Sequence, residues 1–187
     1  MCCTNINMAL GLHITQVTLF LHFTDKIYNA LNQKPSASTL AIFIDLKKAF
    51  DTVDHDILLQ KMEHYGIRGI SSSWFKNYLS DREQFVSING IESGTMKMIS
   101  GVPQGSVLEP LLFPIFINYL PNATDLLTLL FADDTTFQIS DTNIKNLFNS
   151  ANLELVKASS WFRANKLTLN VKKTKSCFSL IKVHNLI

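Results

Sequence analysis

The chain has 187 residues, 47% of them hydrophobic and 17% charged, which indicates one globular domain, or one and a half, with a sizeable core. The formal net charge is only +2, which excludes the strongly basic balance of a nucleic-acid coat protein, so any nucleic-acid contact has to come from a local patch. Three cysteines form no disulfide framework, and no targeting segment or apolar stretch long enough for a bilayer is visible, so we expect an intracellular protein with no membrane partner, nuclear or cytoplasmic.

Hydrophobic periodicity and turn signals predict helices and strands that do not alternate regularly. Asp54 is placed to cap a helix that ends at Gly66, and Asn89-Gly90 is the strongest short signal for a hairpin. The elements expected in chain order are a helix over 12–32, a linker over 34–38, a strand over 39–46, helices over 55–65 and 71–79, a hairpin of 84–88 and 91–99, a helix over 106–120, strands over 126–131 and 135–139, a helix over 143–165, and strands over 167–169 and 177–183. The inward side chains expected on the helix over 143–165 are Leu147, Leu153, Val156, Trp161 and Phe162. This order predicts an α+β fold, an antiparallel sheet backed by helices on one face.

Three short segments carry the chemistry. Asp45 ends an apolar strand, residues 101–106 form a turn rich in backbone groups, and Asp133-Asp134 lies at the tip of an apolar hairpin. Magnesium prefers oxygen ligands, and two such ions can activate a primer hydroxyl and steady a leaving pyrophosphate. We expect Asp45 and Asp133 to bridge two Mg²⁺ ions, with the carbonyl of Leu46 as a further ligand and Asp134 as an outer or weaker one. Taken singly, each aspartate is more simply a cap or a turn residue; their order and spacing favour the metal site.

Four further residues are candidates for binding a nucleotide. The ring of Phe50 could fill the space under the 2′ position of an incoming sugar and so exclude ribonucleotides; the alternative is an ordinary core phenylalanine. Gln104-Gly105 lets the backbone approach a ligand, and the N-terminus of the helix that follows favours phosphate. Lys173 could neutralise or protonate a leaving pyrophosphate; the alternative is a solvated lysine.

Residues 41–55, 101–108 and 131–135 closely resemble motifs A, B and C of the reverse transcriptases of non-LTR retrotransposons, the LINE-like and jockey-like elements. Several residues between 161 and 174 are similar to motif D of the same family. The resemblance runs from about Asp25 to the C-terminus.

The resemblance implies a polymerase palm over 36–187, with residues 1–35 as a helical remnant of the fingers. It implies Mg²⁺, deoxynucleoside triphosphates, and an RNA template paired to a DNA primer as cofactor and partners. The site residues that it implies are the metal ligands Asp45, Asp133 and Asp134, the sugar gate Phe50, and Gln104-Gly105 in the pocket for template and nucleotide.

Three departures from the family pattern bear on activity. Glu109 replaces a glycine and is expected to repel phosphate, and Tyr119 replaces an aspartate. Pro114 is expected to kink or break the helix over 106–120, at a cost of roughly 3 kcal/mol. With most of the fingers and the thumb not recognisable, we expect a truncated chain that is inactive alone.

Two other interpretations stay open. One is a decayed, inactive copy of a retroelement that binds nucleic acid weakly. The other is the palm of a viral RNA-dependent RNA polymerase; against it, that family selects the ribose 2′-hydroxyl where Phe50 stands and commonly has glycine where Ala132 stands.

Overall fold

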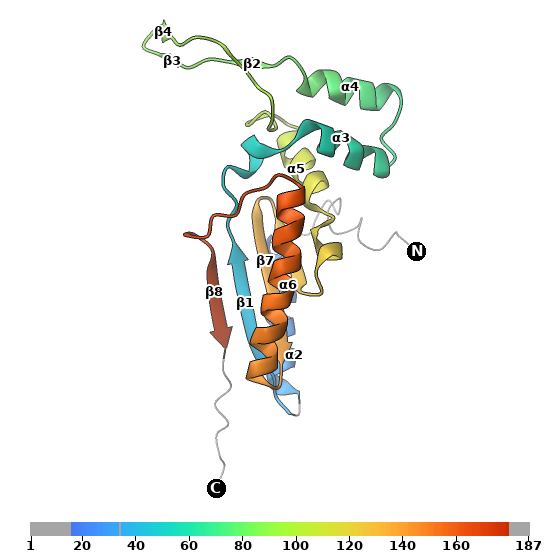
Figure 1. Ribbon diagram of the computed structural model, residues 1–187, viewed down its shortest axis with the longest axis vertical. Coiled ribbons are helices and arrows are strands. Elements are labelled where there is room, and N and C mark those ends of the chain that lie inside the picture. The colour runs from blue at the N-terminus through green and yellow to red at the C-terminus, as the bar shows by residue number, and fades with distance from the viewer. Residues whose placement is uncertain (1–15, 34, 180–187) are drawn as a thin grey trace.

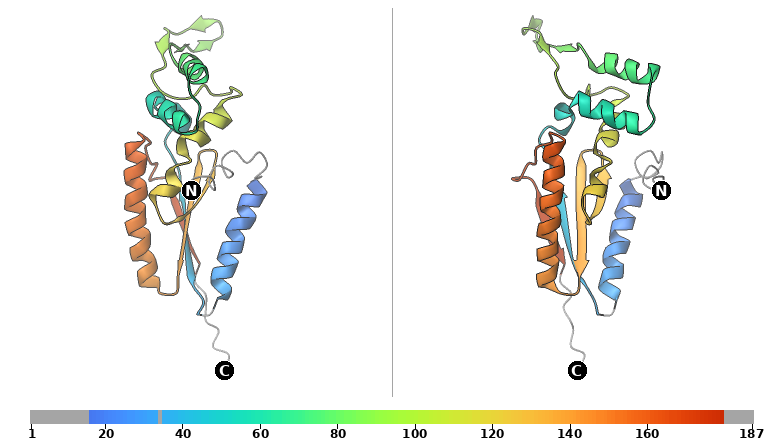
Figure 2. Two further views of the ribbon diagram at one scale, coloured as in Figure 1. Left: turned by 90° about the vertical axis from the view of Figure 1, so that its right-hand side faces the viewer. Right: turned by 45° about the vertical axis from the view of Figure 1, so that its right-hand side comes forward.

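The fold is an antiparallel sheet with one helix against each face, and a second group of helices and short strands beyond one end of the sheet (Figures 1 and 2). The computed structural model describes residues 16–33 and 35–179. Its elements in chain order are α2 (Gln16–Asn32), β1 (Ser38–Ile44), η1 (Ala49–Thr52), α3 (His55–His64), α4 (Ile70–Leu79), β2 (Glu83–Gln84), β3 (Ser87–Ile88), β4 (Ile91–Glu92), β5 (Met96–Lys97), α5 (Glu109–Ile117), η2 (Leu120–Ala123), β6 (Leu127–Phe131), β7 (Asp134–Asp141), α6 (Ile144–Ala164) and β8 (Lys175–Ser179). The α+β class and the antiparallel sheet are as the sequence predicts.

The main sheet has the strand order β6-β7-β1-β8, and every neighbouring pair is antiparallel. The last pair in the β1–β7 ladder is Ile44 with Thr135, and β6 is joined to β7 by a tight turn that follows the pair of Phe131 with Asp134. The residue after Ile44 therefore lies next to the tip of the β6–β7 hairpin.

The core extends from the sheet and α6 to α3 and α5. Leu40, Ile42 and Ile44 of β1 are buried together with Phe137 of β7, because alternate residues of a strand share one face. The buried stripe of α6 consists of Leu147, Ala151, Glu154, Ala158 and Phe162. Helix α2 contacts β1 from the opposite face, whereas the sequence predicted helices on one face only (Figure 2).

Two of the inward positions predicted on α6 are wrong. The side chains of Leu153 and Val156 are 67% and 66% exposed. At 3.6 residues per turn they lie off the stripe that faces the sheet, and the small residues Ala151 and Ala158 take the contact instead.

Helix α5 is continuous through Pro114, so of the expected kink or break the break is wrong and the kink stays a prediction. The helix is also shorter than the expected range 106–120. The N–H of Leu112 donates to the oxygen of Leu108 at 2.9 Å, and that of Asn118 to the oxygen of Pro114 at 3.0 Å, so the helical bonding continues on both sides of the proline. Phe113 and Phe116 are fully buried, and burial of each large apolar side chain stabilises by roughly 1.5–3 kcal/mol, which offsets the cost of the proline.

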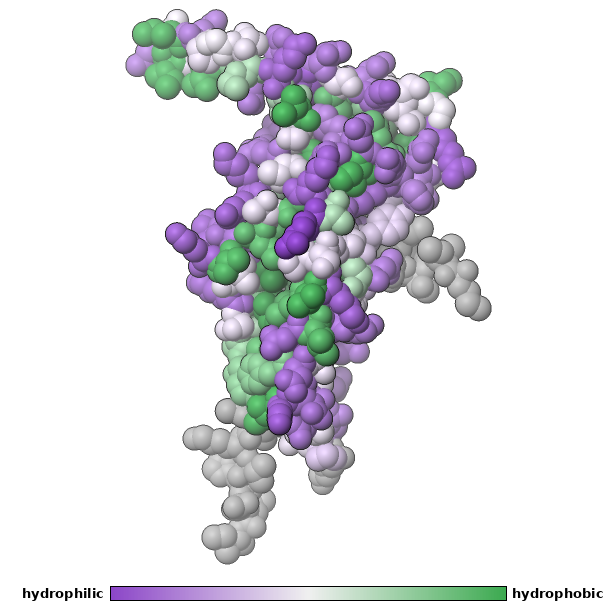
Figure 3. All heavy atoms as spheres, viewed as in Figure 1, coloured by the Kyte–Doolittle hydropathy of each residue, from purple (hydrophilic) through white to green (hydrophobic). Residues whose placement is uncertain are grey.

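The predicted hairpin over 84–99 is two short two-stranded pieces, β2 with β5 and β3 with β4, which form an arm at the far end of the molecule (Figure 1). Asn89 and Gly90 both have positive φ, which is what the expected two-residue turn requires. Apolar side chains gather on the outer end of this arm (Figure 3). Leu169 forms an isolated bridge with Leu46 rather than a strand, and residues 12–15 and 180–183 of the predicted elements lie outside the described residues.

The side chain of Lys61 in α3 contacts residues of α5 and α6 and so links the three helices. Its Nζ donates to the carbonyl of Phe116 and to Oδ1 of Asn165, both at 2.5 Å, and lies 4.2 Å from the centre of the Phe116 ring and 4.7 Å from that of Trp161. Burial lowers the pKa of Lys61 to about 7. Across the described residues, no helix has the length and apolarity needed to cross a membrane.

The low pKa of Lys61 predicts that stability rises with pH. Between about pH 7 and 10.5, the unfolded chain binds a proton that the folded chain has lost, so the free energy of unfolding increases across this window. Urea unfolding followed by circular dichroism should show the increase in the wild type and a smaller one in Lys61→Met. Equal pH dependence of the two proteins would contradict the assignment.

Candidate active site

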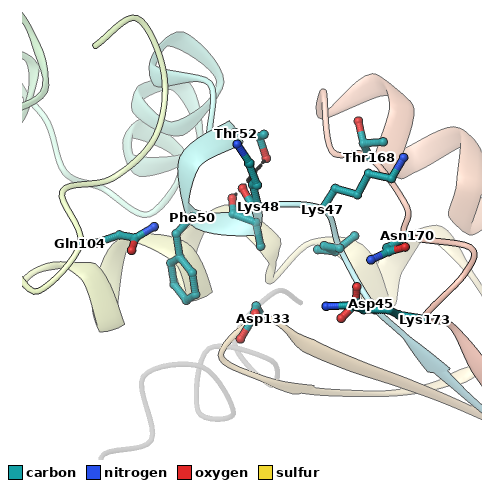
Figure 4. A pocket seen from close by; sticks show the side chains of 12 residues that line it. Asp45, Lys47, Lys48, Phe50, Thr52, Gln104, Asp133, Thr168, Asn170 and Lys173 are labelled. Carbon is teal, nitrogen blue, oxygen red and sulfur yellow. Dashed lines mark hydrogen bonds between the residues drawn. The ribbon is translucent and has the colours of Figure 1, made fainter. Parts of the chain in front are cut away.

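A cavity of about 580 Å³ opens where β1 ends, beside the tip of the β6–β7 hairpin. Loops from four parts of the chain meet there: the segment after β1, the turn before α5, the hairpin tip, and the segment after α6 (Figure 4). The lining residues are Asp45, Leu46, Lys47, Lys48, Ala49, Phe50, Thr52, Gln104, Asp133, Thr168, Asn170 and Lys173.

Asp45 and Asp133 lie on the same side of this cavity (Figure 4). Asp45 directly follows β1 and is half-buried, and its carbonyl accepts the N–H of Asn170 at 2.8 Å. Asp133 is exposed at the hairpin tip, where the positive φ of Ala132 turns the chain. Asp134 is the first residue of β7 and does not line the cavity. The two aspartates expected to bridge metal ions thus share one cavity, and the one expected to be an outer ligand lies outside its lining.

The donor set of the cavity fits a hard divalent cation. Asp45 and Asp133 supply carboxylates, and Leu46 lines the same wall. Mg²⁺ is commonly held by one or two carboxylates together with waters and substrate phosphates. Within 16–33 and 35–179, no three side chains of His, Cys, Asp or Glu are grouped closely enough to hold a metal by themselves. The remaining ligands have to come from the substrate, water or backbone.

Phe50 joins the cavity to the core. It lies in η1, half-buried, with its ring centre 4.8 Å from that of Phe113 in α5. Figure 4 shows the ring between Gln104 and Asp133. Phe50 therefore packs on the core and also lines the space beside the two aspartates.

The turn before α5 places Gln104 in the cavity but not Gly105. The N–H of Gly105 donates to Oε2 of Glu109 at 2.5 Å, and the N–H of Glu109 donates to Oγ of Ser106 at 3.2 Å. The carboxylate of Glu109 is bonded within its own turn, and its expected repulsion of phosphate stays a prediction. The backbone role of Gly105 toward a nucleotide stays a prediction.

The segment after α6 is held against the segment after β1 by backbone bonds. The N–H of Lys47 donates to the oxygen of Thr168 at 2.8 Å, on the other side of the bridge between Leu46 and Leu169. This brings Lys173 to the cavity together with Thr168 and Asn170, which sequence reasoning did not name as site residues. It also did not name the lining residues Lys47, Lys48, Ala49 and Thr52 of the segment after β1. The closeness of these four to Asp45 in the sequence was the available signal, whereas nothing in the local sequence indicates the pairing that brings in Thr168 and Asn170.

The cavity thus combines carboxylates, lysines and an aromatic ring. A protein-family model also matches nearly the whole chain. Residues 3–186 match the family described as reverse transcriptase (RNA-dependent DNA polymerase). The chain belongs to this family. Reverse transcriptases are nucleotidyltransferases and typically depend on metal ions.

Three related proteins are named after non-LTR elements, as the motif resemblance predicts. The chain is 33% identical, over 84% of its length, to the probable RNA-directed DNA polymerase from transposon BS of Drosophila melanogaster. It is 36% identical over half its length to that from mobile element jockey of the same fly, and 28% identical over 72% to a Pol polyprotein from the type-1 retrotransposable element R2 of Popillia japonica. It covers 18%, 11% and 23% of these three proteins.

The fold is also that of solved reverse transcriptases. Telomerase from Candida tropicalis, in complex with a fragment of telomeric RNA, matches 88% of this chain with a TM-score of 0.62 at 16% identity, and the match covers 29% of the telomerase chain. A second telomerase structure from the same organism, truncated from its C-terminal domain, matches 93% of this chain and 37% of its own with a TM-score of 0.51 at 17% identity. Both support the assignment of the fold as a fragment of a polymerase palm.

Gly101 should not tolerate alanine. A Cβ there would lie 2.9 Å from the Cα and the carbonyl oxygen of Asp51, and φ is +93°. Left-handed strain and overpacking against backbone together predict a loss of roughly 2–4 kcal/mol. Urea unfolding of Gly101→Ala measures the loss. Gly94→Ala, at a site with no atom within 4 Å of the added Cβ, should leave stability nearly unchanged. Similar stability for the two variants would contradict this packing.

Proposed function

We propose that this segment carries the catalytic centre of an RNA-directed DNA polymerase, which transfers a deoxynucleotide to the 3′-hydroxyl of a primer. The observation that supports this proposal most is the convergence on one cavity of Asp45, Asp133, Phe50, Gln104 and Lys173. These residues come from four separate parts of the chain, so their meeting is a property of the fold and not of one motif.

Two Mg²⁺ ions held by Asp45 and Asp133, with Leu46 and Asp134 as further ligands, would activate the primer hydroxyl and stabilise the leaving pyrophosphate. The chain's own residues bind and orient. Asp45 follows a strand end, and its carbonyl accepts the N–H of Asn170, so the backbone that carries its carboxylate is held beside the cavity. Precise placement of this kind is most of what nucleotidyl transfer requires of a protein.

Phe50 and Lys173 take complementary parts. The ring of Phe50 is held by Phe113 and closes the cavity where a 2′-hydroxyl of the incoming sugar would lie, so deoxynucleotides are preferred. Lys173 supplies positive charge at the wall formed by the segment after α6, where it neutralises or protonates the departing pyrophosphate. Gln104 lines the cavity and Gly105 is its neighbour in the chain. Both would face the template and the base of the incoming nucleotide.

The names of the relatives support a proposal for the substrates. The transposon BS and jockey proteins are named as RNA-directed DNA polymerases, and the telomerase structure contains a fragment of telomeric RNA. We propose the same class of template for this chain: RNA paired to a DNA primer, with deoxynucleoside triphosphates. Phosphate contacts to such a duplex would come from local lysines, since the net charge is only +2.

Because the chain alone is expected to hold a duplex too weakly to polymerise, the test joins it to the fingers and thumb of a related reverse transcriptase and measures addition of a single deoxynucleotide to a DNA primer annealed to RNA. We expect extension that requires Mg²⁺ and is lost in Asp45→Asn, with Asp25→Asn, an exposed position on α2, as the control for loss of one charge. Extension that persists in Asp45→Asn would contradict the proposal.

The positions of the two hairpin aspartates predict unequal effects on metal binding. Asp133 lines the cavity and Asp134 does not, so Asp133→Asn should weaken Mn²⁺ binding by about tenfold or more and Asp134→Asn by less. Water-proton relaxation with Mn²⁺ measures both affinities. Equal losses of Mn²⁺ affinity in the two variants, or a larger loss in Asp134→Asn, would contradict the assignment of Asp133 as the stronger ligand.

A further inference from the structure

A set of hydrogen bonds joins the loop that carries Phe50 to the turn that carries Gln104. The N–H of Val102 donates to the carbonyl of Phe50 at 2.8 Å, and the N–H of Gly101 donates to the carbonyl of Val53 at 2.7 Å. In addition, Oγ of Ser100 donates to the carbonyl of Asp51 at 3.0 Å. Two segments about fifty residues apart in the sequence are therefore held as one unit beside the cavity.

The side chain of Asp51 links this unit to the side chain of Gln104. Its Oδ1 accepts a hydrogen bond from Nε2 of Gln104 at 2.7 Å. An ionised carboxylate only accepts, so the amide nitrogen of Gln104 must face Asp51, and this fixes which way the amide group is turned. Gln104 lines the cavity, whereas Asp51 does not. Asp51 therefore acts on the cavity indirectly, through its hydrogen bond to Gln104.

The contact at Gly101 makes this unit close-packed. The backbone of Gly101 lies so near that of Asp51 that no side chain fits between them, and the carbonyl of Gly101 is hydrogen-bonded to Nε2 of His55 at 2.7 Å. A shift of the turn before α5 would therefore be transmitted to Asp51 and to its neighbour Phe50.

We propose that Asp51 is a positioning residue for nucleotide selection: its carboxylate orients Gln104 at the cavity and couples this side chain to Phe50. This inference rests on the proposed function, because it assigns Asp51 a part in choosing between deoxy- and ribonucleotides at the same site. Loss of the bond frees Gln104 and loosens the wall beside the Phe50 ring. Discrimination against the 2′-hydroxyl then falls more than nucleotide affinity as a whole.

The experiment compares the binding of Mg²⁺–dGTP and Mg²⁺–GTP to the full 187-residue chain by NMR titration. In Asp51→Ala we expect the ratio of the two dissociation constants to move toward one by about fivefold, the factor that corresponds to one hydrogen bond of ordinary strength. Asp51→Asn keeps an acceptor oxygen and should retain most of the ratio. Thermal unfolding by circular dichroism establishes that each variant is folded.

A double-mutant comparison shows whether Asp51 acts through Gln104. Adding Asp51→Ala to Gln104→Ala should change the ratio no further, and Asp25→Ala, which removes one exposed acidic side chain on α2, should leave it unchanged. An unchanged ratio in a folded Asp51→Ala that still binds dGTP would overturn the inference while leaving the proposed function intact. So would an effect of Asp51→Ala of the same size with and without Gln104. Failure of the wild type to bind either triphosphate would contradict the proposed function and this inference with it.

Discussion

The pairing of Ile44 with Thr135, at the end of the antiparallel ladder between β1 and β7, is the constraint on which the site depends. It fixes the end of β1 beside the turn of the β6–β7 hairpin, so that Asp45 and Asp133 line one cavity although they are far apart in the sequence. A register shifted by one residue would turn Ile42 and Ile44 out of the core, so the packing of the core also fixes the relative positions of Asp45 and Asp133.

Backbone bonds then complete the cavity from two sides. On one side, Asp45 and Lys47 are bonded to Asn170 and Thr168 of the segment after α6; on the other, Phe50 and Val53 are bonded to the turn before α5. Main-chain groups hold the loops, which leaves the side chains available for a substrate. Two of the three departures from the family pattern are compatible with this frame, since α5 continues through Pro114 and Glu109 is bonded to Gly105.

Sequence reasoning succeeded where a pattern is local. The strand before Asp45, the cap at Asp54 and the turn at Asn89-Gly90 each have a signal within a few residues, and the structure contains all three. It failed where the outcome depends on contacts distant in sequence: the exposure of Leu153 and Val156, and the persistence of α5, follow from which helix face meets the sheet and how much apolar surface is buried around a proline. Likewise, the hydrogen bond of Asp51 with Gln104 joins positions that only the folded chain brings together.

We propose that Asp45 and Asp133 together hold the ions that serve nucleotidyl transfer. Anomalous scattering from crystals of the chain soaked with Mn²⁺ and dGTP tests it directly. We predict a manganese peak within coordination distance of both carboxylates, with the triphosphate beside it and Phe50 against the sugar. Manganese bound elsewhere, or bound to Asp134 while Asp133 points away, would contradict the account.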